Sequence, residues 1–330
     1  MKKVLLLLLV FCLFVTGCEK NNSKDILKEL EKKMNQSNGY LLTGTLSVHN
    51  NDEVYHYKVE SLYQKDDKYR ITLTNEANDH TQVILKNSDG VYVLTPSLNK
   101  SFRFQSEWPY NHSQIYLLDA LIKDLEEDSQ KEMEKKKDNY VFQVKCNYPT
   151  NAKLMTQKIV ISKDYKPIKI SVFDKDGVEA MSMDFENVQY SPKISKDAFD
   201  IDTIMDTNME TEVKETSSLE DIVYPLFVPS GTKLVGEEKI EKTNGERVIM
   251  NYDGEKSFLL VEETADVFQE FTVIPTSGEP YFLMDTLGVM TDNSLSWTSG
   301  GVEYYLVSDV MSSEELVQVA QSIGGIVSMK

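Results

Sequence analysis

The chain has 330 residues, and 41% of them are hydrophobic, which is enough to form the cores of two domains and to leave a tail. The 53 acidic residues outnumber the 35 basic ones, so the net charge is −18. This charge argues against nucleic acid as a partner, because phosphate binding needs a cationic surface, and it disfavours adhesion to anionic lipid headgroups through a basic face.

The chain begins with the pattern of a bacterial lipoprotein signal peptide. Lys2 and Lys3 precede an apolar run at residues 4–15, which is shorter than the ~20 apolar residues of a transmembrane helix. Small residues and then Cys18 follow the run. We therefore predict a signal peptide at residues 1–17, lipidation of Cys18 by acyl chains such as palmitate, and a tether at residues 18–24. The alternative is a secreted protein in which this cysteine has no role.

Lipidation would hold the protein on the extracytoplasmic face of the cell membrane. Removal of the signal peptide also removes Cys12, so Cys146 is the one cysteine left besides Cys18. An intrachain disulfide is therefore not expected. Cys146 falls on the apolar side of an alternating segment, which predicts a buried thiol rather than a reactive nucleophile.

Helical and alternating patterns predict the elements between the tether and residue 202. Asn111 is a candidate cap for the second of two helices, and the charged stretch 126–138 behind it is typical of a loop or a helix end. Strand alternation with tight turns predicts an antiparallel meander. The predicted helices are 25–35 and 111–125, and the predicted strands lie within 39–94, 140–148, 157–162, 167–173 and 180–190.

A polar, acidic stretch at residues 203–218 predicts a linker, because it has too few apolar side chains to order itself by burial. The region after it, residues 219–330, contains an Asn-Gly hairpin signal at 244–245 between alternating segments. A last helix begins with a capping box formed by Ser312 and Glu315. These patterns predict a small α+β domain in which the helix closes one face of a sheet.

We find no catalytic or metal-binding pattern in the sequence. No histidine has a metal-ligand partner at helical spacing, and neither a glycine-rich phosphate loop nor a nucleophile elbow is present. Ser97 and Lys100 match the Ser-x-x-Lys of penicillin-recognising enzymes, but they follow Pro96 in a loop between strands, so a chance match is the better interpretation. We expect no enzyme, no cofactor and no metal. The histidines are His49, His56, His80 and His112.

An aromatic segment precedes the second predicted helix. Phe102, Phe104 and Trp108 are candidates to line a groove for a ligand or a partner, together with Leu118 and Leu121 of that helix. Core packing is the alternative, and it is the more common role of aromatic side chains at alternating positions.

This segment also carries a family resemblance. Residues 92–118, followed in order and spacing by residues 147–149, 157–159 and 166–167, resemble the Gram-positive lipoproteins of the Lol-type lipoprotein-carrier (LolA/RseB-like) superfamily. These include sporulation and germination lipoproteins of spore-forming bacteria. The resemblance implies an α+β fold: a curved antiparallel half-barrel sheet, with helices capping its concave apolar face, at residues 25–202. The smaller α+β domain would follow the linker.

Three functions follow from these observations. The first is a membrane-anchored, non-catalytic binding module for a partner protein or a lipid in sporulation or germination, with a cell-wall hydrolase as a possible partner. The second is a lipid or lipoprotein carrier whose concave cavity holds an acyl chain. The carrier of this superfamily shuttles in solution, whereas this chain is predicted to be tethered. The third, a hydrolase using Ser97 and Lys100, is the weakest because it rests on a four-residue pattern.

Overall fold

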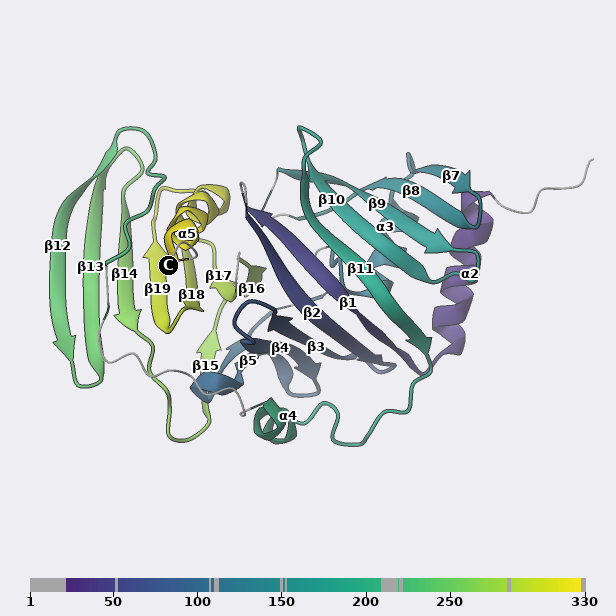
Figure 1. Ribbon diagram of the computed structural model, residues 1–330, viewed down its shortest axis with the longest axis horizontal. Helices are drawn as coiled ribbons and strands as arrows, with labels where there is room; N and C mark the ends of the chain where they lie inside the picture. The colour runs from purple at the N-terminus through teal and green to yellow at the C-terminus, as the bar shows by residue number, and fades with distance from the viewer. Residues whose placement is uncertain are drawn as a thin grey trace, which may run out of the picture.

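The computed structural model describes residues 22–50, 53–106, 108–109, 113–148, 151, 153–208, 219, 222–283 and 286–327. Within these residues the chain forms a twelve-stranded sheet and a seven-stranded sheet. Figure 1 shows the large sheet curving around α3, with α2 at one end of the molecule and the small sheet at the other. The α+β class and the curved antiparallel sheet predicted from the sequence are confirmed.

The large sheet contains the predicted meander and the strands after it. Its order is β15-β6-β5-β4-β3-β2-β1-β11-β10-β9-β8-β7, and all its pairings except β15 with β6 are antiparallel. The strands are β1 (Gly39–Asn50), β2 (Glu53–Gln64), β3 (Lys68–Asn75), β4 (Thr81–Asn87), β5 (Gly90–Thr95), β6 (Lys100–Phe104), β7 (Glu132–Lys136), β8 (Asn139–Lys145), β9 (Leu154–Ser162), β10 (Pro167–Asp174), β11 (Glu179–Tyr190) and β15 (Thr272–Thr276).

The small sheet belongs to the second region, and α5 packs on one of its faces. Its order is β12-β13-β14-β19-β18-β17-β16. The strands are β12 (Thr232–Lys242), β13 (Gly245–Gly254), β14 (Phe258–Thr264), β16 (Glu279–Phe282), β17 (Leu287–Met290), β18 (Ser294–Ser299) and β19 (Val302–Val307). The helical elements of the described residues are α2 (Ser23–Gln36), the 3-10 turn η1 (Pro96–Leu98), α3 (Leu118–Glu127), α4 (Ile201–Asn208) and α5 (Ser313–Val327).

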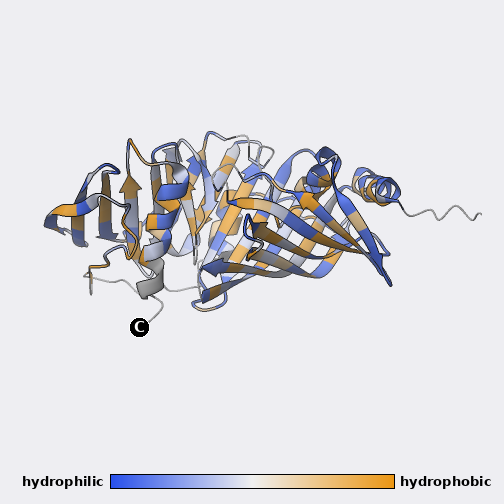
Figure 2. Ribbon diagram, turned by 90° about the horizontal axis from the view of Figure 1, so that it is seen from above, coloured by the Kyte–Doolittle hydropathy of each residue, from blue (hydrophilic) through white to orange (hydrophobic). Residues whose placement is uncertain are grey.

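Both faces of the large sheet bury apolar side chains. Successive residues of a strand point to opposite faces, so Ile84 packs on the concave face, towards α2 and α3, while Val83 and Leu85 pack on the convex face. Figure 2 shows the resulting alternation of hydrophobic and hydrophilic residues along the strands. The segment around α4 covers the convex face with Phe199, Ile204 and Met205. The meander is therefore the middle layer of a three-layer arrangement.

Three predicted boundaries are wrong. Helix α3 begins at Leu118, and no side chain caps it, because residues 115–117 are buried in a turn that leads into it. Asn111 lies outside the described residues. The charged stretch 126–138, predicted to be a loop or a helix end, begins with the last residues of α3 but also contains β7. Strand β7 pairs with β8 at the edge of the sheet, where charged side chains are tolerated. Residues 203–208 of the predicted linker form most of α4, and the rest of the linker lies outside the described residues.

The local signals of the second region are confirmed. The Asn-Gly turn connects β12 to β13, with Lys242 opposite Gly245. At the start of α5 the capping box is reciprocal: the Ser312 N–H donates to the Glu315 carboxylate over 2.8 Å, and the Glu315 N–H donates to the Ser312 hydroxyl over 3.3 Å. The apolar stripe of this helix is buried against the small sheet. None of the helices in the described residues is long and apolar enough to cross a membrane.

The two regions share core and sheet, which the sequence did not predict. Strand β15 leaves the second region and pairs in parallel with β6 of the large sheet. Leu287 and Val289 of β17 pack in the concave core. The buried Gln82 side chain on β4 accepts the Leu287 N–H over 2.7 Å and the Thr286 hydroxyl over 3.0 Å. The second region is thus attached to the first by backbone pairing and by buried side chains.

Limited proteolysis is expected to cut first within residues 209–218, because their polar, acidic composition offers little to bury. The division into domains at 25–202 and 219–330 stays a prediction. The contacts of β15 and Gln82 should hold the two products together. They should co-elute in size-exclusion chromatography and separate only in denaturant. First cuts within 126–138, or products that separate without denaturant, would contradict this result.

Candidate binding face

The concave face is closed at one end by α3, which is fastened by a buried carboxylate. Asp119 in the first turn of α3 accepts the Tyr40 hydroxyl over 2.6 Å and the Tyr69 hydroxyl over 2.8 Å. The Leu118 N–H in turn donates to the Tyr40 oxygen over 3.2 Å. Burial raises the pKa of Asp119, and the two tyrosine hydrogen bonds oppose that rise. These bonds connect α3 to β1 and β3, so they position the helix over the sheet.

A second buried carboxylate fastens the other end of α3. Asp124 accepts the Ser113 hydroxyl over 2.9 Å and a hydrogen bond from the Gln157 amide on β9. Ser113 is itself held, because its hydroxyl accepts the Asn147 N–H over 2.8 Å. Burial raises the pKa of Asp124 to about 6, although both hydrogen bonds lower it. Helix α3 is therefore latched at both ends by polar groups inside an apolar layer.

Replacing Asp124 with Asn is expected to change how stability depends on pH. The ordinary pKa of this carboxyl is 3.8 and its folded pKa is about 6, so its stabilising contribution is complete below pH 3.8 and is lost as pH rises through 6. Asn has no proton to lose and hardly changes the shape. Relative to wild type, Asp124→Asn should gain stability between pH 4 and 6, by at most about 3 kcal/mol. Urea unfolding at several pH values tests this; parallel profiles of the two proteins would contradict it.

Four of the five predicted groove residues are buried in the concave core. Phe104, Trp108, Leu118 and Leu121 belong to one apolar cluster, in which the Trp108 ring packs edge-on against Tyr69 with centroids 5.8 Å apart. Phe102 is half-buried, and the Lys100 ammonium lies 4.8 Å from its ring centroid. The structure therefore brings these residues together under α3 and at the adjoining β6, mostly as packing. Their role as a groove stays a prediction.

The open end of the concave face is occupied by the second region. The Phe282 ring on β16 packs edge-on against Tyr57 at 5.9 Å and lies 5.7 Å from the Tyr116 ring. The cavity beside it measures about 120 Å³ and is lined mainly by apolar side chains, including Leu46, Ile115 and Met181. The concavity is thus largely filled by side chains of the protein itself.

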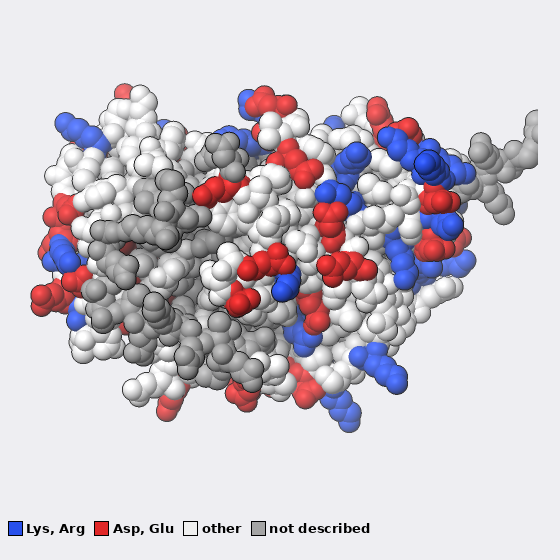
Figure 3. All heavy atoms as spheres, viewed as in Figure 1, with Lys and Arg blue, Asp and Glu red and all other residues white. Residues whose placement is uncertain are grey.

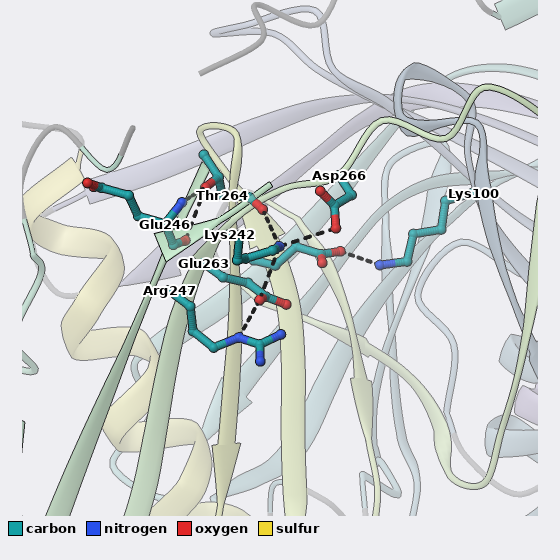
Figure 4. A network of polar contacts seen from close by, with 8 residues as sticks. Lys100, Lys242, Glu246, Arg247, Glu263, Thr264 and Asp266 are labelled. Carbon is teal, nitrogen blue, oxygen red and sulfur yellow. Dashed lines mark hydrogen bonds and ion pairs between the residues drawn. The ribbon is translucent and has the colours of Figure 1, made fainter. Parts of the chain in front are cut away.

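An ion pair crosses the junction between the two regions, and further ion pairs of the second region lie near it (Figure 4). The Lys100 ammonium on β6 is buried and pairs with Glu303 on β19. Nearby, Lys242 lies 3.2 Å from both Glu263 and Asp266, and the Arg247 guanidinium donates to Glu263 over 2.6 Å. A second cavity, of about 250 Å³, lies between the β4–β6 end of the large sheet and the small sheet.

The surroundings of Ser97 and Lys100 differ from the arrangement that a catalytic Ser-x-x-Lys pattern needs. Ser97 lies in η1, a single 3-10 turn, and its hydroxyl is 3.3 Å from the His80 ring nitrogen. Lys100 lies in the following strand, with its ammonium bound to Glu303. A lysine that is held as a cation in an ion pair is poorly placed to accept a serine proton. The chance-match interpretation of Ser97 and Lys100 agrees with this geometry.

The histidines and Cys146 are the other candidates for metal binding or for a reactive side chain. Within the described residues no three His, Cys, Asp or Glu side chains gather as metal ligands. His49 lies 3.8 Å from Glu179, His56 bonds to Ser47, and His112 is outside the described part of the chain. Cys146 is a free thiol whose pKa burial raises to about 12, which suits an unreactive group.

Sequence reasoning missed three residues that shape this face. Asp124 had a detectable signal, because it lies directly before Leu125 within an apolar helical stripe, where a carboxylate must find buried partners. Asp119 sits on the first turn and had a weaker signal of the same kind. Phe282 had none, because its partners Tyr57 and Tyr116 are distant in the sequence.

The chain is thus an α+β protein with a curved antiparallel sheet whose concave face is covered by helices. The profile of the sporulation protein YdcC-like family matches residues 1–199, and the chain belongs to that family. It is 38% identical over 321 residues to sporulation protein YdcC of Bacillus subtilis (strain 168), covering 96% of this chain and 95% of that protein.

Solved structures with a similar fold are remote in sequence. The MucA/MucB complex of Pseudomonas aeruginosa matches at 13% identity and a TM-score of 0.34, covering 92% of this chain and 98% of that chain. LolA superfamily protein NE2245 from Nitrosomonas europaea matches at 11% identity and a TM-score of 0.32, covering 56% and 99%. The CwlD amidase from Clostridioides difficile in complex with the GerS lipoprotein matches at 15% identity and a TM-score of 0.24, covering 53% and 99%.

Proposed function

We propose that this protein is a lipoprotein, anchored through Cys18 to the extracytoplasmic face of the membrane, that acts in sporulation as a non-catalytic binding module for a partner protein. Membership of the sporulation protein YdcC-like family supports a role in sporulation. The signal pattern before Cys18 supports anchoring on the extracytoplasmic face of the membrane. The resemblance of residues 92–118 to sporulation and germination lipoproteins supports a cell-wall hydrolase as the class of partner and a further role in germination.

The observation that carries the proposal is the filled concave face. Ligand pockets of small molecules usually measure about 300–1,000 Å³. The cavity beside Phe282 is about 120 Å³ and the cavity between the β4–β6 end and the small sheet is about 250 Å³, so both are smaller than such pockets. Helix α3 is also held by Asp119 and Asp124 and does not rest on apolar contacts alone. A domain packed in this way presents a rigid outer surface to a partner and leaves little internal room for a lipid.

The carrier hypothesis, unlike the binding-module hypothesis, requires side chains to move away from the concave face. For an acyl chain to enter the concave face at this end, Phe282 would have to leave its place beside Tyr57 and Tyr116. The apolar lining of the cavity is the feature that favours this second function. The two hypotheses therefore predict opposite results for the binding of a fatty acid to the unmodified protein.

Titration of the mature chain with a fluorescent fatty acid tests this difference. We expect no saturable submicromolar binding to the wild type, because the cavity is too small. Phe282→Ala removes the ring from the mouth and should allow measurable binding, while Phe227→Ala, at a half-exposed phenylalanine of the second region, serves as the matched control and should behave as the wild type. Saturable submicromolar binding by the wild type would contradict the binding-module proposal and favour the carrier.

The partner itself can be sought by mass spectrometry of the natively purified, cross-linked protein from sporulating cells. A stoichiometric protein partner, reduced when the exposed surface is altered and not when the core is, supports the proposal. Stoichiometric lipid without any protein would contradict it. The same measurement detects both a bound protein and a bound lipid, so it distinguishes the two hypotheses.

A further inference from the structure

A stripe of lysines marks the outward face of α2, the first helix of the described chain. Lys24, Lys28 and Lys32 are exposed and are spaced four residues apart, which places them on one side of the helix. The opposite side carries Ile26 and Leu30, which are buried in the concave core. The lysines therefore point away from the protein along the end of the molecule.

Two hairpin turns bring further lysines to the same end. The turn before β8 and the turn before β10 are joined, because the Lys163 N–H donates to the Asp138 carbonyl over 2.9 Å. The second turn reaches α2 through Tyr190: its hydroxyl donates to the Tyr165 carbonyl over 3.0 Å, and its ring lies 5.6 Å below the Lys33 ammonium. The exposed lysines of these turns are Lys135, Lys136, Lys137, Lys163 and Lys166.

The local charge at this end is opposite to that of the whole protein. Residues 22–36, 131–138 and 162–166 contain ten lysines and seven carboxylates. With Glu126, which lies beside Glu31 of α2, and Asp128, which lies beside Lys131, the local net charge is +1 in a chain of −18. Figure 3 shows basic side chains interspersed with acidic ones at the end where the chain enters α2. The acidic total, which disfavours a basic face, therefore conceals one basic end.

The predicted anchor lies at this same end. Three residues separate Cys18 from Asn22, whose side chain caps α2, and a fully extended chain between these two residues spans at most about 14 Å. A lipid on Cys18 would therefore keep the start of α2 close to the headgroups. At physiological ionic strength electrostatic attraction extends about 8 Å from a charged surface, so only lysines held this near contribute.

We propose that the end formed by α2 and these two turns docks on anionic phospholipid headgroups, and that this contact orients the protein. The inference rests on the proposed anchor at Cys18. Each lysine near an anionic membrane strengthens attachment by about fivefold. Because β12 and the small sheet lie at the opposite end of the molecule, docking points the second region away from the membrane, towards partners in the envelope (Figure 1).

Lysine footprinting of the full lipidated protein tests the orientation. The protein is added to preformed vesicles of phosphatidylcholine, with or without phosphatidylglycerol, and a membrane-impermeant acylating reagent labels exposed amines for mass spectrometry. Lys24, Lys28 and Lys32 should be labelled several-fold more slowly on the anionic vesicles, and 1 M salt should abolish the difference. The exposed lysines Lys193, Lys196 and Lys233 are internal controls and should be labelled equally on both.

A charge-neutralising variant separates docking from anchoring. Lys24→Gln, Lys28→Gln and Lys32→Gln together should leave flotation with vesicles unchanged but should restore the labelling of residues 135–137 to the rate seen on neutral vesicles. The matched variant at residues 193, 196 and 233 should keep the wild-type difference. Equal labelling of the wild type on both vesicles overturns docking alone. A protein that floats with neither vesicle overturns the anchor, and the docking proposal with it.

Discussion

Replacing Leu121 with Ala is expected to lower the free energy of unfolding by about 2–5 kcal/mol, the range for a leucine deleted from a packed core. Leu121 is 2% exposed and lies on α3 between the two carboxylates that latch the helix to the sheet. Because these latches prevent the helix from collapsing into the space left by the leucine, the cost should fall in the upper part of the range. Urea unfolding of the mature chain measures it.

Leu226→Ala is the matched control for this measurement. Leu226 is 73% exposed, so the same chemical change should alter stability by less than about 0.5 kcal/mol. If Leu121→Ala also costs less than 1 kcal/mol and gains affinity for a fluorescent fatty acid, α3 is a mobile lid. That result would favour the carrier hypothesis over the packed binding module.

Replacing Cys18 with Ala is expected to move the protein out of the membrane fraction or to leave an unprocessed precursor. The thiol is the predicted site of the lipid, and its replacement removes the buried acyl chains, which contribute about 0.8 kcal/mol per CH₂ to membrane attachment. Detergent phase separation distinguishes the lipidated from the unlipidated form. The change should be close to complete because a single residue carries the modification.

Cys146→Ala is the matched control, because it removes the other cysteine of the mature chain. This free thiol lies in the folded domain, and its loss should leave fractionation as in the wild type. Normal processing and unchanged membrane association of Cys18→Ala would contradict lipidation. It would also remove the geometric basis for docking of the α2 end on the membrane.

Some of the candidate site was predictable. The aromatic segment and the apolar stripe of α3 were recognised as belonging together, and four of the five named side chains do meet in one core. Their packing around Tyr69, and the closure of the open end by Phe282, depend on strands remote in the sequence. A sequence pattern reports which side chains must be buried, but not which neighbours bury them.

The sequence by itself determined the features that involve only residues close together in the chain. The helix stripe of α2, the Asn-Gly turn and the capping box of Ser312 and Glu315 each involve groups a few positions apart, so local geometry is enough to specify them. The lipoprotein signal is also a local pattern, and lipidation of Cys18 stays a prediction.

Only the tertiary structure decided where elements begin and how the two regions join. The start of α3 follows from the burial of residues 115–117, which overrides the capping signal, and charged β7 is a strand because β8 offers it an edge. Asp119 finds its hydroxyl partner 79 residues away, and Gln82 finds its backbone partner 205 residues away. Such contacts form only when the whole chain has folded, because burial leaves these polar groups no water as an alternative partner.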